Sequence, residues 1–145
     1  MVTEPHAAVR LVDIRETPLD PAEVLEALAD VAAGGVTLFV GTVREQDQGK
    51  PVTGLEYSAH PSAMARLREV CDAVATRYDV HGVAALHRVG RLGLGEAAVI
   101  VATAAGHRGE AFESSRALID DLKATVPIWK HQMFTDGTDE WVGTP

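Results

Sequence analysis

The sequence DDLKATVPIWKHQM, residues 120–133, contains the change from helix to strand on which the predicted fold depends. Lys123 falls in the last turn of an amphipathic helix. Pro127 stops that helix, because proline has no N–H to donate and clashes with the preceding turn. The apolar residues directly after it favour a strand. Two of the chain's three lysines, Lys123 and Lys130, therefore lie on adjoining rigid elements and can converge on one pocket.

The lysine pair has two interpretations. In a chain of net charge −8, converging amines favour a site for an anionic substrate, or for negative charge that forms during a reaction. The alternative is a pair of solvated side chains, since most lysines are exposed. The spacing of the two residues leaves both interpretations open.

Composition indicates a globular protein, and we expect residues 1–145 to form a single compact domain. The chain is 46% hydrophobic and 23% charged, which is ordinary for that class. No apolar run reaches the roughly 18 residues of a membrane span, and the N-terminus lacks the apolar segment of a signal peptide. The net charge of −8 disfavours general nucleic-acid binding. Cys71, the one cysteine, lies on an apolar helical face and is expected in the core, which fits a cytoplasmic location.

Outward from residues 120–133, strands alternate with three amphipathic helices. Alternating apolar residues predict the strands, and apolar residues at steps of three and four predict the helices. The fold class is therefore α+β, with three helices packed on a mostly antiparallel sheet. We expect strands at residues 9–14, 35–43, 52–57, 83–89, 97–104, 128–134 and 140–142, and helices from residue 20 to the glycines at 34–35, over 64–78 and over 109–124.

Some details of this pattern are specific. The strands at residues 35–43 and 52–57 are expected to pair as a hairpin across the loop 44–51. The strands at 128–134 and 140–142 are expected to form a second hairpin. Apolar stripes would face inward from Val24, Leu25, Leu28 and Val31 in the first helix, and from Phe112, Ile119 and Leu122 in the third.

Further cationic side chains flank the ends of the predicted elements. His107 and Arg108 lie at the start of the third helix, where a helix N-terminus stabilises an anion. Gly106 and Gly109 beside them would let a ligand approach the backbone. The alternative is a polar helix start in water. Arg44, after the most apolar strand, is by itself an ordinary strand-end charge, but beside the other cations it becomes a further candidate for phosphate binding.

Histidine spacing argues against a metal site. The histidines show neither the two-on-one-face helical spacing nor the accompanying carboxylate of a zinc motif. His87, in a predicted strand, is expected to be a packed or hydrogen-bonded structural residue. We therefore expect no metal ligands among His60, His81, His87, His107 and His131.

Several short segments, spread from residue 39 to residue 130, are specific in their order and spacing. They are Phe39-Val40-Gly41-Thr42-Val43-Arg44, Leu55-Glu56-Tyr57 with Met64-Ala65, His87-Arg88-Val89-Gly90, Gly95-Glu96, His107-Arg108 with Ala111-Phe112, and Leu122-Lys123 through Pro127-Ile128-Trp129-Lys130. Through these segments the chain resembles the MoaE family, the large catalytic subunit of molybdopterin synthase.

The chain departs from the family pattern in two places. His131 and Gln132 follow the second lysine, where the family usually has a basic residue and then a glutamate. Ser58 stands where a glutamate usually follows the tyrosine. Gln132 removes the carboxylate that an acid–base role at that position would need, whereas all five cationic candidates are retained.

The resemblance implies an enzyme with a defined reaction. A molybdopterin synthase adds two sulfurs to cyclic pyranopterin monophosphate to form the molybdopterin dithiolene. Each sulfur comes from the C-terminal thiocarboxylate of a small ubiquitin-like subunit, MoaD. The resemblance also implies an α/β hammerhead with a small β-subdomain, a homodimer at the centre of a heterotetramer, and no metal or organic cofactor.

The same resemblance implies roles for the candidate residues. Lys123 would hold the thiocarboxylate tail and its carbonyl. Lys130 would act at the pterin as a charge stabiliser or general acid, since crowded cations lower a lysine pKa. The phosphate or pterin would be held by Arg44 together with His107 and Arg108, from the same subunit or from the other subunit of the dimer.

Two other functions remain open. One is a paralogue that binds the small subunit or the pterin without turnover, which Gln132 favours. The other is a phosphate binder or hydrolase that uses His107 as an acid–base group and needs no protein partner. The groove for the small subunit is expected around Trp129, Phe134 and Trp141, with Trp129 in the core and Trp141 at the interface.

Overall fold

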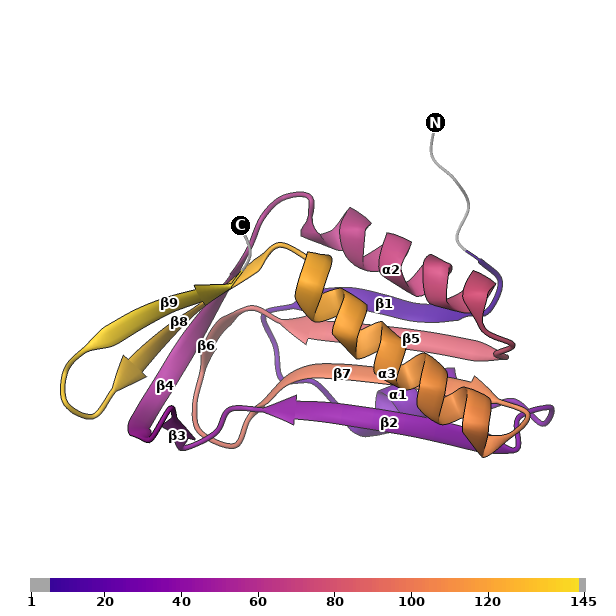
Figure 1. Cartoon of the computed structure of the whole chain (residues 1–145), viewed down its shortest axis with the longest axis horizontal. Helices are drawn as coiled ribbons and strands as arrows, with labels where there is room; N and C mark the ends of the chain where they lie inside the picture. Colours follow the sequence, from indigo (N-terminus) through magenta and orange to yellow (C-terminus); the bar gives the residue numbers. More distant parts are fainter. Residues whose placement is uncertain (1–5, 144–145) are drawn as a thin grey trace.

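The computed structural model describes residues 6–143 as two β-sheets that meet at an angle (Figure 1). The first sheet contains, in spatial order, β1 (Val9–Arg15), β5 (Gly82–Arg88), β7 (Ala97–Ala105) and β2 (Gly35–Thr42). β1 runs parallel to β5, and the other pairs are antiparallel. β1 and β2 are therefore the edges of this sheet.

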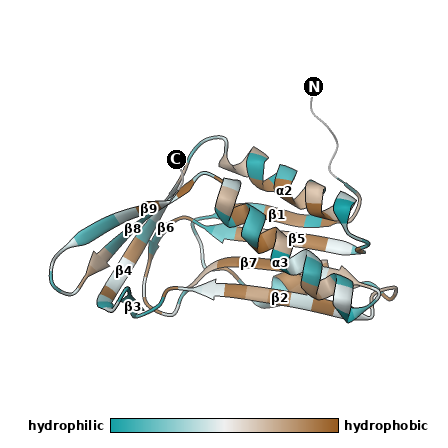
Figure 2. Cartoon of the chain, viewed as in Figure 1, coloured by the Kyte–Doolittle hydropathy of each residue, from teal (hydrophilic) through white to brown (hydrophobic). Residues whose placement is uncertain are grey.

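Helices cover both faces of the first sheet. The longer two, α2 (Ala63–Arg77) and α3 (Arg108–Thr125), lie on one face, and the short α1 (Pro21–Ala27) lies on the other. β5 and β7 between them are buried almost throughout, and their apolar sequences suit strands with both faces covered (Figure 2). Core side chains include Leu67, Val74, Val101 and Leu118 on the first face and Leu28, Leu86 and Ile100 on the second.

The second sheet is built on β4 (Lys50–Ala59), which pairs with β8 (Ile128–Phe134) and the short strands β3 (Gln46–Asp47) and β6 (Gly90–Leu92). β9 (Asp139–Gly143) pairs with β8 and confirms the expected C-terminal hairpin. The predicted α+β class, with three helices and mostly antiparallel strands, is confirmed. The single domain expected over the whole chain stays a prediction, because residues 1–5 and 144–145 lie outside the described part.

The helix-to-strand change around Pro127 links the two sheets. α3 ends at Thr125, and the N–H of Val126 donates to the Leu122 carbonyl at 3.0 Å. Pro127 cannot extend the helix, and β8 begins with the next residue. The two lysines that flank this point therefore lie where the sheets meet.

The hairpin expected between residues 35–43 and 52–57 is wrong. β2 pairs with β7 in the first sheet, whereas β4 pairs with β8 and β6 in the second. The chain leaves the first sheet at Val43, whose N–H donates to the Glu96 carbonyl at 3.0 Å. The loop expected at residues 44–51 instead contains its own tight hairpin, formed by β3 and the start of β4.

Three side chains expected to face inward are exposed, and the first of them, Leu25 of α1, is 46% exposed. Val31 is fully exposed because α1 ends before it, and Asp30 then accepts a hydrogen bond from the Ala32 N–H at 2.9 Å, which favours a turn. Phe112 is 63% exposed, although Ile119 packs inward as expected. Phe112 is out of phase with the buried residues of its helix, Ala111, Ser114, Ser115, Leu118 and Leu122.

Two leucines near the first helix test this packing. Leu28 is fully buried, whereas Leu25 is 46% exposed. We expect Leu28→Ala to lower the free energy of unfolding by about 2–5 kcal/mol, through lost burial and a residual cavity. Leu25→Ala should lower it far less. Urea unfolding of both variants measures the difference, and equal losses would contradict the packing described.

Candidate active site at the junction of the two sheets

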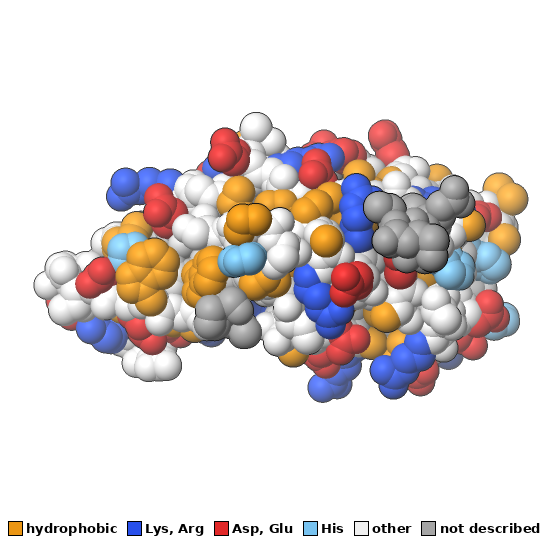
Figure 3. Space-filling model, turned by 90° about the horizontal axis from the view of Figure 1, so that it is seen from above, with side chains coloured by type: hydrophobic (Ala, Val, Ile, Leu, Met, Phe, Trp, Pro, Cys, Tyr) orange, Lys and Arg blue, Asp and Glu red, His pale blue; other side chains and the backbone are white. Residues whose placement is uncertain are grey.

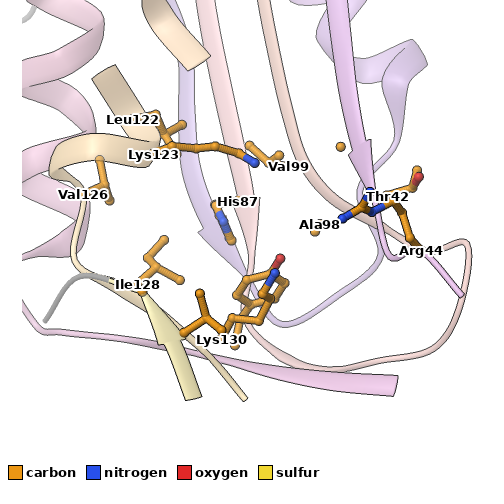
Figure 4. Close-up of a pocket in the computed structure, with 14 residues that line it drawn as sticks. Thr42, Arg44, His87, Ala98, Val99, Leu122, Lys123, Val126, Ile128 and Lys130 are labelled. Atoms are coloured by element: carbon orange, nitrogen blue, oxygen red, sulfur yellow. The ribbon is translucent and has the colours of Figure 1, made fainter. Parts of the chain in front are cut away.

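The two sheets form a cavity of about 360 Å³ where they meet (Figure 4). Its lining comes from both sheets and from the end of α3, and much of it is small or apolar. None of the described lining residues is acidic. The polar and titratable side chains of the lining are Thr42, Arg44, Tyr57, His87, Lys123 and Lys130.

Three of the five cationic candidates line this cavity. Lys123 reaches it from the last turn of α3, Lys130 from β8, and Arg44 from the chain just after β2 (Figure 4). Lys130 lies opposite Tyr57 of β4 in the second sheet. The two lysines on either side of Pro127 therefore converge, as their positions in the sequence suggest.

The surroundings of Lys130 perturb its amine. It is half-buried, and burial lowers the pKa of its ammonium group. The positive charges of Lys123 and Arg44 add to this effect, whereas Asp47 and Glu140 oppose it. A lysine with a lowered pKa can exchange a proton closer to neutrality than a solvated lysine does.

Arg44 lies at the exposed rim of the cavity. Its side chain is 76% exposed, and its Nη2 is 3.5 Å from Asp47 Oδ1. An ion pair with that exposure contributes little to stability. Asp47 therefore biases the position of the guanidinium, which remains accessible to an anion that enters the cavity.

His87 forms part of the cavity wall and is neutral. Its Nδ1 lies 2.7 Å from the Arg88 carbonyl, which can only accept, so Nδ1 carries the proton and Nε2 is free to accept. Burial lowers the pKa of this imidazole to about 4. The ring meets Tyr57 edge-on at 5.0 Å. The packed, hydrogen-bonded histidine expected from the sequence is confirmed, but its place in the cavity and that of Tyr57 were not anticipated, because both depend on strand pairing.

His107 and Arg108 lie elsewhere. They stand at the start of α3, both exposed, and neither lines the cavity. Lys123 lies fifteen positions after Arg108 in α3, a distance of about 22 Å along the helix axis. One copy of the chain therefore does not bring this pair to the other three cations.

Other features of the described chain carry no site. Cys71 is fully buried, as expected, and burial raises the pKa of its thiol to about 12. Within residues 6–143, no three or more His, Cys, Asp and Glu side chains cluster in a way that could hold a metal ion. No helix in that range is long and apolar enough to cross a membrane. The cytoplasmic location stays a prediction.

Comparison with known proteins defines the class of this chain. The molybdopterin synthase catalytic subunit 1 of Mycobacterium tuberculosis is 40% identical over 131 residues, which cover 90% of this chain and 88% of that protein. A crystal structure of molybdopterin synthase from Staphylococcus aureus matches with a TM-score of 0.86 and 29% identity, over 92% of this chain and 97% of that one. A complex of subunits 1 and 2 of molybdopterin-converting factor from Helicobacter pylori shares the fold, with a TM-score of 0.67 and 21% identity, over 95% of this chain and 90% of that one.

The class is therefore that of catalytic subunits of molybdopterin synthase, which are enzymes of molybdopterin biosynthesis. The MoaE family, described as "MoaE protein", matches residues 14–125. The chain belongs to the MoaE family. The family resemblance, the fold class and the enzyme class expected from the sequence are confirmed.

Burial of His87 makes stability depend on pH. The pKa of this imidazole is about 4 in the fold and 6.5 for a free histidine, so protons bind the unfolded state first as pH falls from 6.5 toward 4. Stability is lost over that range. Between pH 7.5 and pH 5, we expect the unaltered protein to lose about 2 kcal/mol more than His87→Gln. Chemical denaturation at both pH values measures this, and equal losses would mean that the imidazole is not buried in its neutral form.

Proposed function

We propose that this chain moves two sulfurs from the C-terminal thiocarboxylate of a small MoaD-type subunit to cyclic pyranopterin monophosphate, forming the molybdopterin dithiolene. One observation carries the proposal. In a chain of net charge −8, Lys123, Lys130 and Arg44 converge on a cavity with no acidic residue in its described lining. Such a cavity attracts an anion locally, whereas the acidic surface around it does not.

The reaction needs charge stabilisation more than it needs a new nucleophile, because the thiocarboxylate sulfur is already nucleophilic. In each transfer, sulfur bonds to a side-chain carbon of the pterin, and that carbon loses its oxygen. Water then adds to the acyl group, the sulfur–acyl bond breaks, and the tail leaves as a carboxylate. Negative charge grows on the departing oxygen and at the acyl carbon, and cations fixed beforehand in a cavity stabilise it. Holding sulfur and carbon together lowers the barrier further.

The three cations are suited to different tasks because their burial differs. Lys130, half-buried and with a pKa that burial lowers, would stabilise charge or donate a proton at the pterin. Lys123, at the end of α3, would hold the thiocarboxylate tail and its carbonyl. Arg44, 76% exposed at the rim, would bind the substrate phosphate, for which a guanidinium is well suited.

We also propose that His107 and Arg108 act in the site of a second copy of the chain. β2 is an edge strand, and such strands are prone to pair with another strand. Two-fold antiparallel pairing of β2 with its copy would set the Gly35 end of one strand against the Thr42 end of the other. Exposed apolar side chains on β2 and on α3 beside it support such a contact: Val36, Phe39 and Phe112.

The two ends of β2 carry the two parts of the cation set. A Cβ on Gly35 would lie 3.7 Å from the Cα of Arg108, so the start of α3 sits over that end of the strand. Arg44 follows the other end. The β2 pairing would therefore direct His107 and Arg108 of each subunit toward the cavity of its neighbour. This homodimer would form the centre of a heterotetramer with one small subunit at each end.

The small subunit would dock beside β9 and send its tail into the cavity. Val142 of β9 lines the cavity, and its neighbour Trp141 is 60% exposed. Trp141 stacks on His131 with ring centroids 4.3 Å apart. Figure 3 shows hydrophobic and histidine side chains grouped on this part of the surface. Of the other aromatic residues expected in the groove, Trp129 is half-buried and Phe134 is buried, so Trp141 is the better anchor.

Reconstitution tests the lysine roles. The protein is combined with thiocarboxylated small subunit and cyclic pyranopterin monophosphate, and molybdopterin is measured as its fluorescent oxidised derivative. We expect Lys123→Ala and Lys130→Ala each to lower turnover by about 100-fold or more, because each removes a preorganised charge. Lys50→Ala is the matched control. This third lysine lies outside the cavity, 3.1 Å from Asp136, and its loss should leave turnover near normal.

The outcomes separate the proposed function from its alternatives. Near-normal turnover in both lysine variants would make their assignment wrong. No product from the unaltered protein, with the small subunit still bound, would identify a paralogue that binds without turnover, as Gln132 suggests. If the unaltered protein forms no product and does not bind the small subunit, the proposed function is overturned. Phosphate release from a monoester without a protein partner would identify a hydrolase.

Subunit complementation tests the shared site. Arg108→Ala and Lys130→Ala are each expected to be inactive alone. After coexpression, each mixed dimer would contain one site with both residues intact, so about a quarter of the unaltered activity should return. Arg116→Ala is the control, because Arg116 is 85% exposed on the same helix, and it should be active alone. No recovery in the mixture would contradict a site shared between subunits.

A further inference from the structure

Gln132 is buried and makes a specific contact behind the cavity. It is 3% exposed, and its Nε2 donates a hydrogen bond to Asp47 Oδ2 at 2.6 Å. The two residues are 85 positions apart in the sequence. Gln132 is also a position at which the chain departs from the family pattern, with an amide where a glutamate is usual. A carboxylate therefore does lie next to position 132, but it belongs to Asp47 of β3 and not to residue 132 itself.

A tight hairpin places Asp47 beside β8. Asp47 pairs with Lys50, and the turn between them has φ values of 51° at Gln48 and 79° at Gly49. Positive φ at both central residues is typical of a type I′ turn, whose twist matches that of its strands. Within the described chain, Gln48 is the single non-glycine residue with positive φ, an unfavourable conformation for a glutamine. The strain is thus located where the hairpin fixes Asp47.

The other oxygen of the carboxylate faces the cations of the cavity. Asp47 Oδ1 lies 3.5 Å from Arg44 Nη2, and the Asp47 side chain is 19% exposed. Asp47 and Gln132 line a hollow of about 50 Å³ that shares Thr42, Arg44, Tyr57 and Lys130 with the main cavity. The carboxylate therefore lines a hollow together with two of the three cations and does not line the main cavity.

We propose that Asp47, held by its hydrogen bond from Gln132, is a positioning residue for Arg44 and Lys130. Asp47 thereby supplies the carboxylate that position 132 lacks. It restrains the guanidinium at the rim and favours the charged form of the lysine amine, without touching the substrate. The catalytic consequence rests on the proposed function. The effect on the charge of Lys130 does not, because it requires only the fold.

The chemistry of the pair explains why the amide is suited to position 132. The NH₂ group of Gln132 donates and the carboxylate of Asp47 accepts, so both groups are satisfied. Gln132→Glu alone would place two carboxylates at about 2.6 Å, and one of them would have to bind a proton. The double variant Asp47→Asn with Gln132→Glu would restore one donor and one acceptor and return a carboxylate to the same hollow.

Lys130 is surrounded by charges of both signs. Burial lowers the pKa of its amine, and Asp47 of β3 is the largest opposing influence, ahead of Glu140 of β9. Loss of the Asp47 charge should therefore lower the pKa of Lys130 further. The remaining charged or titratable side chains that line the cavity with it are Lys123 of α3, Arg44 after β2, Tyr57 of β4 and His87 of β5.

NMR of the full-length protein labelled with carbon-13 lysine tests this without substrate. The chain has three lysines, and loss of a signal in Lys130→Arg identifies the one that belongs to Lys130. We expect Asp47→Asn to move the titration midpoint of Lys130 to lower pH by about half a unit or more. The double variant should return the midpoint toward its original value. Asp136→Asn, which removes a carboxylate from the turn after β8, is the matched control and should leave the midpoint unchanged.

An unchanged Lys130 midpoint in Asp47→Asn would overturn the proposal. If that variant does not fold, the double variant decides. A midpoint equal to the original would then support the proposal, because the carboxylate is present from the other position. A lowered midpoint would refute it.

Turnover in the reconstituted reaction gives the second readout. We expect Asp47→Asn to lower kcat by about tenfold and to move the pH profile to lower pH, with recovery in the double variant. An identical profile in Asp47→Asn and the unaltered protein would overturn the positioning role. No product from the unaltered protein would instead count against the proposed function, and the NMR titration would still decide how Asp47 acts on Lys130.

Discussion

The structure depends on the point at which α3 stops. A helix that continued past Pro127 would follow the first sheet, and β8 would not be available to pair with β4. Because the helix ends there, the chain crosses to the second sheet close to where β2 leaves the first one. Side chains on these crossings then face one space between the sheets. The cavity is therefore a consequence of topology. Its cations lie on the two segments that pass from one sheet to the other: Arg44 just after β2, and Lys123 and Lys130 on either side of Pro127.

The cavity is lined by cations although the chain as a whole is acidic. Carboxylates outnumber basic side chains by 21 to 13 over the whole chain, yet none of them is in the described lining of the cavity. Burial lowers the pKa of the Lys130 amine, and repulsion from Lys123 and Arg44, which share the partly buried space, lowers it further. Asp47 and Glu140 offset part of that repulsion from outside the cavity. These two carboxylates favour the charged form of the amine, and neither of them lines the cavity that an anion would enter.

Local sequence signals predicted the elements well but did not predict their partners. The proline stop, the glycine-rich turns and the apolar periodicity located most helices and strands. The pairing of β2 with β7 and of β4 with β8 joins residues far apart in the chain, and no local pattern specifies it. Asp47 and Tyr57 were overlooked for that reason, because their relation to the lysines exists only after β4 pairs with β8. The exposed positions of Val31 and Phe112 show that an apolar residue at helical spacing faces inward only if the helix extends to it in the right phase.

The exposed edge strand β2 has one set of cations near each of its ends. β2 presents unpaired backbone groups together with Val36 and Phe39, and an edge of this kind tends to associate with another strand. The cavity at one end of β2 has three cations, and the other end carries His107 and Arg108, about 22 Å away along α3. Two-fold pairing through β2 would cover the edge and bring the two sets of cations together in one step. A dimer is therefore the simplest arrangement in which all five side chains serve one anionic substrate, and two such sites follow from its symmetry.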